Sequence, residues 1–368
     1  MSFGTLVDRV RREMDERQLP SCQLAIARDG ELVLFETLGA PDGTRFHIWS
    51  CSKAVVASLV WLLVDEGRLA FDDKIAAHLP SFGTNGKDVI TVEQVLLHTA
   101  GFPLAPMGPA YWATQEGRRD AFARWRLNWE PGSRYQYHEL AAGWLLAELA
   151  SAVCDDEDYR VLLRRLVIEP LGLSTFALGV PEDEQGDIAD VVPMHAAATD
   201  DDYRAAGLAP LPPPTTPPNA AVVINTPAAR AVGIPGGGAV ATAADVARFY
   251  QSLLGFGPSL WSAELVADVT GVVRNTFPDL SRWGEPASRS RGLVIRGDDE
   301  PYSSYRHHFG TATSPATFGH DGAGGQIAWA DPASGSSFCF LTSGYDANRV
   351  RELLRNQDLS RLAAETAG

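Results

Sequence analysis

Strand-like segments lie near both ends of this chain, and helix-like segments fill the region between them. Residues 23–40 form two β-rich runs on either side of Asp29–Gly30, a pattern typical of an antiparallel hairpin. Strand-like runs return at residues 292–297, 314–332 and 334–344. We therefore predict an α+β fold in which N- and C-terminal strands form one antiparallel β-sheet flanked by helices, with a mainly helical domain inserted in the middle.

The same pattern suggests where the two parts of the chain meet. Residues 1–80 and 235–368 would form the sheet domain, and residues 81–234 the mainly helical inserted domain. Residues 205–219 contain too many prolines for a helix or a central strand. We predict a loop there, which is either a surface linker or one wall of a cleft.

One predicted helix is far more apolar than the others. It starts near Ser50 and ends at Gly67, and its sequence is apolar nearly all round. A helix without a polar face has to be buried, so we expect it at the centre of the molecule. Thr91 and Thr242 precede further helical runs and are expected to cap them.

Composition excludes several classes of function. The chain has 46 acidic and 31 basic residues, a net charge of −15, which argues against binding to nucleic acid or to anionic membranes. Its N-terminal residues lack the apolar stretch of a signal peptide, and no run approaches about 18 consecutive apolar residues, so we expect no membrane span. Its four cysteines are too few for a disulfide framework and lack metal-ligand spacing. We expect a cytoplasmic protein without a bound metal.

The first candidate for chemistry is the pair Ser50 and Lys53 at the start of the apolar helix. Residues three apart share a helix face, so the lysine amine can reach the serine hydroxyl. A lysine among apolar neighbours has a lowered pKa and can take the proton that activates serine as a nucleophile. On its own, a serine and a lysine at this spacing is a weak motif.

Two later segments could complete such a site. Tyr137 follows a Pro-Gly turn and could bring a phenol that shuttles protons beside Lys53. Residues 318–325 place four glycines in a strand-like run, which suggests that something approaches this backbone closely. The N–H groups of Ser50 and Ala323 could then hold an oxyanion, and His320 would line the cleft.

Taken together and in this order, the motifs resemble the serine β-lactamase-like superfamily, which includes penicillin-binding proteins, class C β-lactamases and related esterases. Ser50 and Lys53 match its Ser-x-x-Lys pattern, and Tyr137 matches the tyrosine of its Tyr-x-Asn pattern. His320-Asp321-Gly322 stands in place of Lys-Thr-Gly, as in the esterase-like branch. The resemblance covers roughly residues 20–345 and extends to residues 65–82, 90–103 and 235–249.

Two departures from the family pattern bear on the substrate. Glu139 stands where the asparagine would contact an amide of a β-lactam, and a carboxylate can only accept hydrogen bonds. His320 replaces a lysine, so a fixed positive charge that would pair with a substrate carboxylate is expected to be missing. The resemblance therefore implies a site in which Glu139, His320 and Gly322 contact a substrate less charged than a β-lactam.

The predicted function is a serine hydrolase that forms an acyl-enzyme on Ser50, with a small carboxylic ester as substrate and no cofactor. Lys53 and Tyr137 would relay protons, and the sequence leaves open which of them is the base. A D-amino-acid peptidase or amidase and a weak β-lactamase remain alternatives on the same fold. A catalytically silent ligand-binding or scaffold protein is the alternative from a different class.

Overall fold

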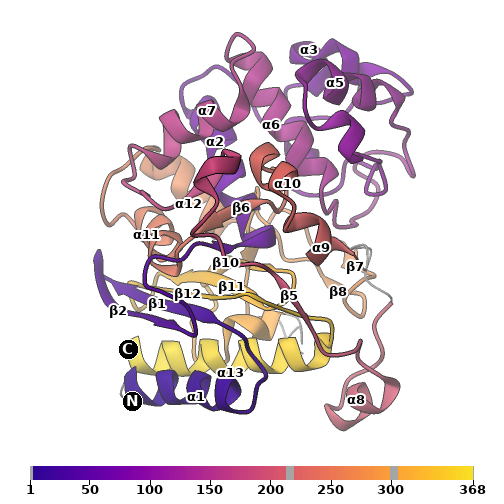
Figure 1. Ribbon diagram of the computed structural model, residues 1–368. Coiled ribbons are helices and arrows are strands. Elements are labelled where there is room, and N and C mark those ends of the chain that lie inside the picture. Colours follow the sequence, from indigo (N-terminus) through magenta and orange to yellow (C-terminus); the bar gives the residue numbers. More distant parts are fainter. Residues whose placement is uncertain (1–2, 213–218, 299–305, 368) are drawn as a thin grey trace.

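The computed structural model describes residues 3–212, 219–298 and 306–367, and its centre is a six-stranded antiparallel sheet in the order β2-β1-β12-β11-β10-β9 (Figure 1). Strand β1 (Cys22–Arg28) pairs with β2 (Glu31–Leu38) on one side and with β12 (Ser336–Thr342) on the other. The first and last parts of the chain thus share one sheet, and the predicted α+β fold is confirmed.

Both faces of this sheet are covered. Helices α1 (Phe3–Asp15) and α13 (Arg349–Ala367) lie side by side under one face, and α11 (Ala243–Leu253) packs on the other (Figure 1). Side chains alternate along each strand, so Leu24 and Ile26 point towards α1 and α13 while the small Ala25 and Ala27 point the opposite way. Burial on both faces explains the nearly continuous apolar runs in these strands.

The apolar helix is central, as predicted, but it begins later than expected. Helix α2 spans Ser52–Asp65, and its side chains are buried on every side. The residues just before it, Trp49–Cys51, form a 3₁₀ turn. Ser50 therefore belongs to this turn and is not the cap of the helix.

Local sequence signals account for several element ends. Asp29 and Gly30 have φ values of +49° and +88°, as a tight hairpin turn between β1 and β2 requires. The Thr91 side chain accepts a hydrogen bond from the Gln94 N–H in a capping box, and Thr242 accepts one from the Asp245 N–H. The two predicted helix caps are confirmed.

Most remaining helices belong to the upper part of the molecule in Figure 1, and the division into two domains stays a prediction. In chain order the other helices are α3 (Ile75–His78), α4 (Val92–Leu96), α5 (Gln115–Arg124), α6 (Ala141–Val153), α7 (Tyr159–Leu163), α8 (Asp200–Ala205), α9 (Ala220–Ile224), α10 (Pro227–Val232) and α12 (Ala263–Gly271). A π-helical turn, Arg164–Ile168, continues α7.

The short strands bring distant segments towards one place. They form a three-stranded sheet, a parallel pair, a hairpin and the end of the main sheet. Their bounds are β3 (Phe46–His47), β4 (Ala177–Leu178) and β6 (Ala239–Ala241); β5 (Val192–Met194) with β13 (Gly344–Asp346); β7 (Pro278–Asp279) with β8 (Glu285–Pro286); and β9 (Val294–Ile295), β10 (Phe318–Gly322) and β11 (Gln326–Asp331).

The proline-rich loop lies partly outside the described residues, because residues 213–218 are not among them. Its first part runs along the hairpin β7–β8 and the start of α13. The Ala209 carbonyl accepts a hydrogen bond from Trp283 Nε1 (2.6 Å), and the Pro212 carbonyl accepts one from Arg349 Nη1 (3.0 Å).

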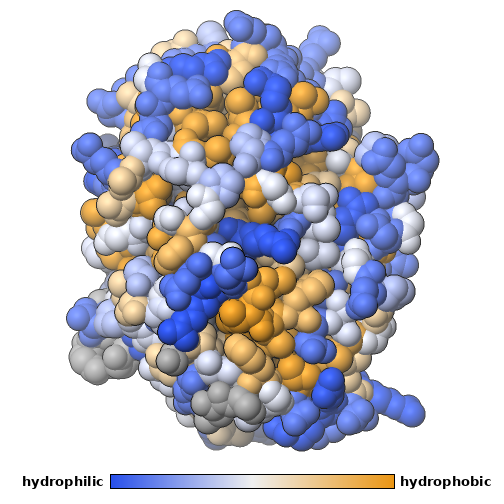
Figure 2. All heavy atoms as spheres, turned by 90° about the vertical axis from the view of Figure 1, so that its left-hand side faces the viewer, coloured by the Kyte–Doolittle hydropathy of each residue, from blue (hydrophilic) through white to orange (hydrophobic). Residues whose placement is uncertain are grey.

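One side of the sheet remains an open edge. Among the described residues, strand β2 pairs with β1 alone, and its Val33 and Phe35 side chains are 41% and 36% exposed. Figure 2 shows hydrophobic side chains gathered in the lower half of this side of the molecule, at the height of β2 in Figure 1. The functional residues lie elsewhere, where α2 meets β10.

Candidate active site

Ser50 and Lys53 meet at the start of α2, as the spacing predicted. Lys53 Nζ donates hydrogen bonds to Ser50 Oγ (3.0 Å) and to the Gly236 carbonyl (2.5 Å). Trp49, directly before the serine, has a φ of +48°, in the left-handed region that non-glycine residues seldom adopt. Such backbone conformations are found preferentially at functional sites, where the surrounding structure maintains them.

The Lys53 amine is buried in apolar surroundings. Its side chain borders an apolar pocket between α2, α4 and α6, and the residue is only 7% exposed. Burial lowers the pKa of Lys53 to about 7; nearby Glu139 acts to raise it and Arg289 to lower it further. At neutral pH a large fraction of the amine is therefore unprotonated and able to accept a proton.

Tyr137 stands beside this pair. Lys53 Nζ and Arg289 Cζ each lie 4.9 Å from the centre of its ring. Its hydroxyl oxygen is buried and has no partner at hydrogen-bond geometry among the described residues. Burial raises the pKa of the phenol well above its ordinary value, while Arg289 and the Ser50 hydroxyl act in the opposite sense. Tyr137 is therefore protonated at neutral pH.

Two buried histidines hold the segment that carries Tyr137. The His138 N–H donates to His98 Nδ1 (3.2 Å), and the Phe102 N–H donates to His138 Nε2 (3.1 Å). Desolvation lowers the pKa of both histidines, that of His138 to about 3, so both rings stay neutral and can accept these bonds. The rings of His98 and Tyr137 are 4.7 Å apart, so this pairing also fixes the phenol.

His320 lies on β10, next to Tyr137. Its Nδ1–H donates to the Asp321 carbonyl (2.6 Å), which leaves Nε2 to accept from Arg289 Nη1 (3.3 Å). Burial, and secondarily Arg289, lowers the pKa of His320 to about 3. The ring is thus neutral, as the sequence suggested. The backbone carbonyl of His320 accepts a hydrogen bond from the Cys51 thiol (3.3 Å), which connects β10 to the turn that contains Ser50.

Gly322 allows β10 to approach the turn Trp49–Cys51 closely. A Cβ at this position would lie 2.7 Å from the Ile48 carbonyl oxygen and 3.1 Å from Trp49 Cβ. The glycine-rich run is not one continuous strand, because β10 ends at Gly322 and residues 323–325 form the turn to β11. Ala323 therefore lies at the tip of β10, directly after the contact of β10 with the segment before Ser50.

Arg289 was missed by the sequence analysis. It follows the hairpin β7–β8, is 4% exposed, and donates from Nε to the Tyr135 hydroxyl (2.8 Å). Position 320 carries a neutral histidine, but this guanidinium brings a positive charge to the place where Tyr137 and His320 meet. No local sequence pattern distinguishes Arg289 from Arg291 and Arg296, two other arginines in the same stretch of the chain.

Glu139 and Asp321 add negative charge to the same region. The charge of the Glu139 carboxylate acts to raise the pKa of Lys53 and the pKa of Tyr345. The Asp321 carboxylate lies 3.8 Å from Arg282 of the β7–β8 hairpin. All seven residues named as site candidates thus come from three segments that meet at the start of α2. Their separate roles remain proposals.

No other chemistry is apparent in the described part of the chain. Within residues 3–212, 219–298 and 306–367, no group of three His, Cys, Asp or Glu side chains could hold a metal ion. No helix in these ranges has both the length and the apolar character needed to cross a membrane.

The chain is similar to known proteins in sequence and in fold. A family model described as Beta-lactamase matches residues 6–363. The esterase/beta-lactamase LipL of Mycobacterium tuberculosis is 29% identical over 348 residues, which cover 86% of this chain and 76% of that protein. A penicillin-binding protein homologue from Caulobacter crescentus has a TM-score of 0.81 and 28% identity, covering 100% of this chain and 97% of that one. A family VIII carboxylesterase has the same fold, with a TM-score of 0.80, 23% identity, and coverage of 98% and 97%.

The matched family and the shared fold define a class of enzymes, the serine hydrolases. The family match extends over nearly the whole chain. The chain belongs to the beta-lactamase family.

Proposed function

We propose that this protein is a carboxylesterase that forms an acyl-enzyme on Ser50. The observation that carries the proposal is the contact between Lys53 Nζ and Ser50 Oγ (3.0 Å), with the lysine pKa lowered by burial to about 7. The similarity to a protein named as an esterase supports the same activity.

The pKa directions favour Lys53 as the base and Tyr137 as the proton donor. Ser50 Oγ attacks the ester carbonyl carbon while its proton passes to the neutral amine of Lys53. When the tetrahedral intermediate collapses, the C–O bond of the ester breaks and Tyr137 gives its proton to the leaving alkoxide. Lys53 then returns a proton to Tyr137. Water repeats the sequence on the acyl-enzyme and releases the carboxylic acid.

The developing negative charge would be held by the N–H groups of Ser50 and Ala323. Gly322 brings the tip of β10 against the residues before Ser50, so the two amides belong to adjoining segments. Fixed amide donors in a dry site stabilise an oxyanion, and loss of one such donor typically costs about 100- to 1,000-fold in rate.

The charges of the site favour an uncharged ester. We assign substrate contacts to Glu139, His320 and Gly322, and the carboxylate of Glu139 repels an acidic group on the substrate. Arg289 is engaged by Tyr135 and His320. It nevertheless supports a second candidate, a D-amino-acid peptide or β-lactam whose carboxylate would approach this guanidinium. Preferred turnover of nitrocefin over p-nitrophenyl esters would favour that candidate.

The test compares hydrolysis of p-nitrophenyl acetate and butyrate by the wild type and by Ser50→Ala. We expect the variant to lose turnover and to lose labelling by a fluorophosphonate. Ser58→Ala is the control, because Ser58 lies within α2, beyond the turn that carries Ser50, and its hydroxyl donates a hydrogen bond to the Val55 carbonyl (2.8 Å). Equal ester turnover by Ser50→Ala and wild type would disprove the nucleophile.

A further inference from the structure

The turn after β10, residues 323–325, is contacted on the side away from Ser50 as well as on the side that faces Ser50. The Asp346 N–H donates a hydrogen bond to the Gly324 carbonyl (3.3 Å). Gly325 has a φ of +118°, and a Cβ added there would overlap the guanidinium of Arg355 on α13. The turn that contains Ala323 is therefore packed between the segment of the nucleophile and helix α13.

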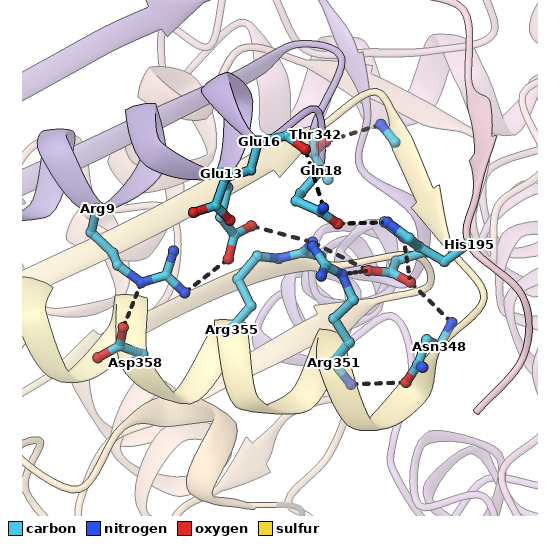
Figure 3. Close-up of polar contacts among 12 residues, drawn as sticks. Arg9, Glu13, Glu16, Gln18, His195, Thr342, Asn348, Arg351, Arg355 and Asp358 are labelled. Atoms are coloured by element: carbon cyan, nitrogen blue, oxygen red, sulfur yellow. Dashed lines mark hydrogen bonds and ion pairs between the residues drawn. The ribbon is translucent and has the colours of Figure 1, made fainter. Parts of the chain in front are cut away.

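Arg355 is an unusual residue to find behind a turn. It is 2% exposed, and its ion-pair partners are Asp346 Oδ2 at 3.5 Å and Glu13 Oε2 at 3.8 Å (Figure 3). None of its nitrogens has a partner at hydrogen-bond geometry within the described residues. A guanidinium that is buried without direct hydrogen bonds costs more to desolvate than an apolar side chain of similar volume.

The two carboxylates that face Arg355 are themselves fixed. Asp346 receives contacts from Arg351 Nε (3.1 Å), His195 Nδ1 (3.2 Å) and the Asn348 N–H (3.0 Å). Figure 3 shows these groups converging from α13 and from the segment after β5.

On the other side, Glu13 of α1 pairs with Arg9 at 2.8 Å, and Arg9 also bonds Asp358 of α13 at 2.7 Å. The negative charges on both sides of Arg355 are thus anchored to elements outside the active site. They keep the guanidinium against Gly325.

We propose that Arg355 is a positioning residue for the oxyanion site. Its guanidinium occupies the space into which the turn 323–325 would otherwise relax, and so keeps the Ala323 N–H directed towards the carbonyl oxygen of a substrate on Ser50. This inference rests on the proposed acyl-enzyme function. It assigns a catalytic consequence to a charge cluster that touches neither substrate nor nucleophile.

The experiment measures kcat and KM for p-nitrophenyl acetate in Arg355→Met and Arg355→Lys. We expect kcat to fall about 10- to 100-fold in Arg355→Met, as small misplacements of catalytic groups do, with KM changed by less than about threefold. The rate of fluorophosphonate labelling should fall by a similar factor, because charge develops on the same oxygen. The pH at half-maximal kcat/KM should not move, since Lys53 is untouched.

Arg118→Met is the matched control. Arg118 is 4% exposed and pairs with Glu148 at 2.5 Å, on helices away from the turn. Its loss should lower the unfolding temperature and leave kcat near the wild-type value. A loss of kcat in Arg118→Met equal to that in Arg355→Met would overturn the proposal, because the effect would then follow stability alone.

Arg355→Lys keeps the charge but does not replace the guanidinium against Gly325, so its kcat should lie between those of Arg355→Met and the wild type. If the methionine variant does not fold, the lysine variant decides, and wild-type kcat and labelling rate in it overturn the inference. Wild-type kcat in Arg355→Met also overturns the inference. If Ser50→Ala is inactive in the same assay, the proposed esterase function still stands. Full activity of Ser50→Ala would refute the function and this inference together.

Discussion

At the scale of single residues, the charge of Lys53 is set by opposing neighbours. Desolvation and Arg289 favour the neutral amine, whereas Glu139 and Asp321 favour the ammonium. In the proposed mechanism the neutral amine accepts the serine proton, so these neighbours would set the pH at which the enzyme works. The lysine pKa of about 7 implies that kcat/KM rises with pH through the neutral range.

Glu139→Gln tests this dependence. The Glu139 carboxylate raises the pKa of Lys53, so its removal should lower that pKa and shift the acid limb of kcat/KM to lower pH. A pH–rate profile with p-nitrophenyl acetate measures the shift. Exposed Glu130→Gln, on the same loop, is the control and should leave the profile unchanged. A limb that moves to higher pH would contradict the assignment of Lys53 as base.

Tyr137→Phe and Tyr135→Phe should separate activity from stability. The Tyr137 hydroxyl has no partner at full hydrogen-bond geometry among the described residues, although the Ser50 hydroxyl is close enough to lower its pKa. Its loss should therefore change the melting temperature little but cost about 100- to 10,000-fold in kcat. Tyr135→Phe instead removes the acceptor of Arg289 Nε. We expect that variant to lose about 1–3 kcal/mol of unfolding free energy. Thermal melts and ester kinetics of both variants check the contrast.

The sequence predicts these residues unequally well. Ser50 and Lys53 are separated by one helical turn, so their contact follows from local geometry. Tyr137 was placed by its family motif. Arg289 reaches the site because Asn275 and Arg289 pair across the base of a hairpin, a long-range arrangement that no local pattern encodes.

At the scale of elements, the contact between β10 and the turn Trp49–Cys51 defines the site. Gly322→Ala should push them apart, because its Cβ would lie 2.7 Å from the Ile48 carbonyl oxygen. We expect kcat for p-nitrophenyl acetate to fall about 10-fold or more. Gly271→Ala is the control, since a Cβ there meets no atom within 4 Å. An unchanged kcat in Gly322→Ala would show that this contact does not position the oxyanion donors.

Strands, caps and the central helix were predictable because each has a local signature of alternation, polarity or turn residues. The start of α2 was placed too early, because a 3₁₀ turn and a first helical turn look alike in sequence. The end of β10 was missed for a related reason. Glycine favours both a close backbone approach and a turn, and here Gly322 serves the first while Gly324 and Gly325 serve the second.

At the scale of the whole molecule, buried histidines make stability sensitive to acid. Desolvation lowers the pKa of His47, His138 and His320 to about 3, whereas unfolded histidine titrates near 6.5. Below pH 6.5 the unfolded chain binds protons that the native protein does not, so stability is present above this pH and is lost as pH falls towards 3. Each such group contributes about 1.4 kcal/mol per pH unit.

Urea denaturation at pH 7.5 and pH 5 should therefore show a lower midpoint at pH 5. His47→Leu should reduce the difference, because neither ring nitrogen of His47 has a partner within the described residues and leucine leaves no polar group unpaired. A difference as large as that of the wild type would mean that His47 does not contribute.

The pairing of β1 with β12 has a consequence for synthesis of the protein. Strand β1 has two neighbours, β2 and β12, and Cys22 of β1 faces Thr342 of β12. Strand β2 follows β1 directly in the chain, whereas β12 leaves the ribosome much later. Strand β10, which must reach the turn of Ser50, also belongs to this late portion. In the proposed mechanism, a growing chain therefore carries Ser50 for most of translation without its oxyanion partner, and hydrolysis begins only when the C-terminal strands close the sheet.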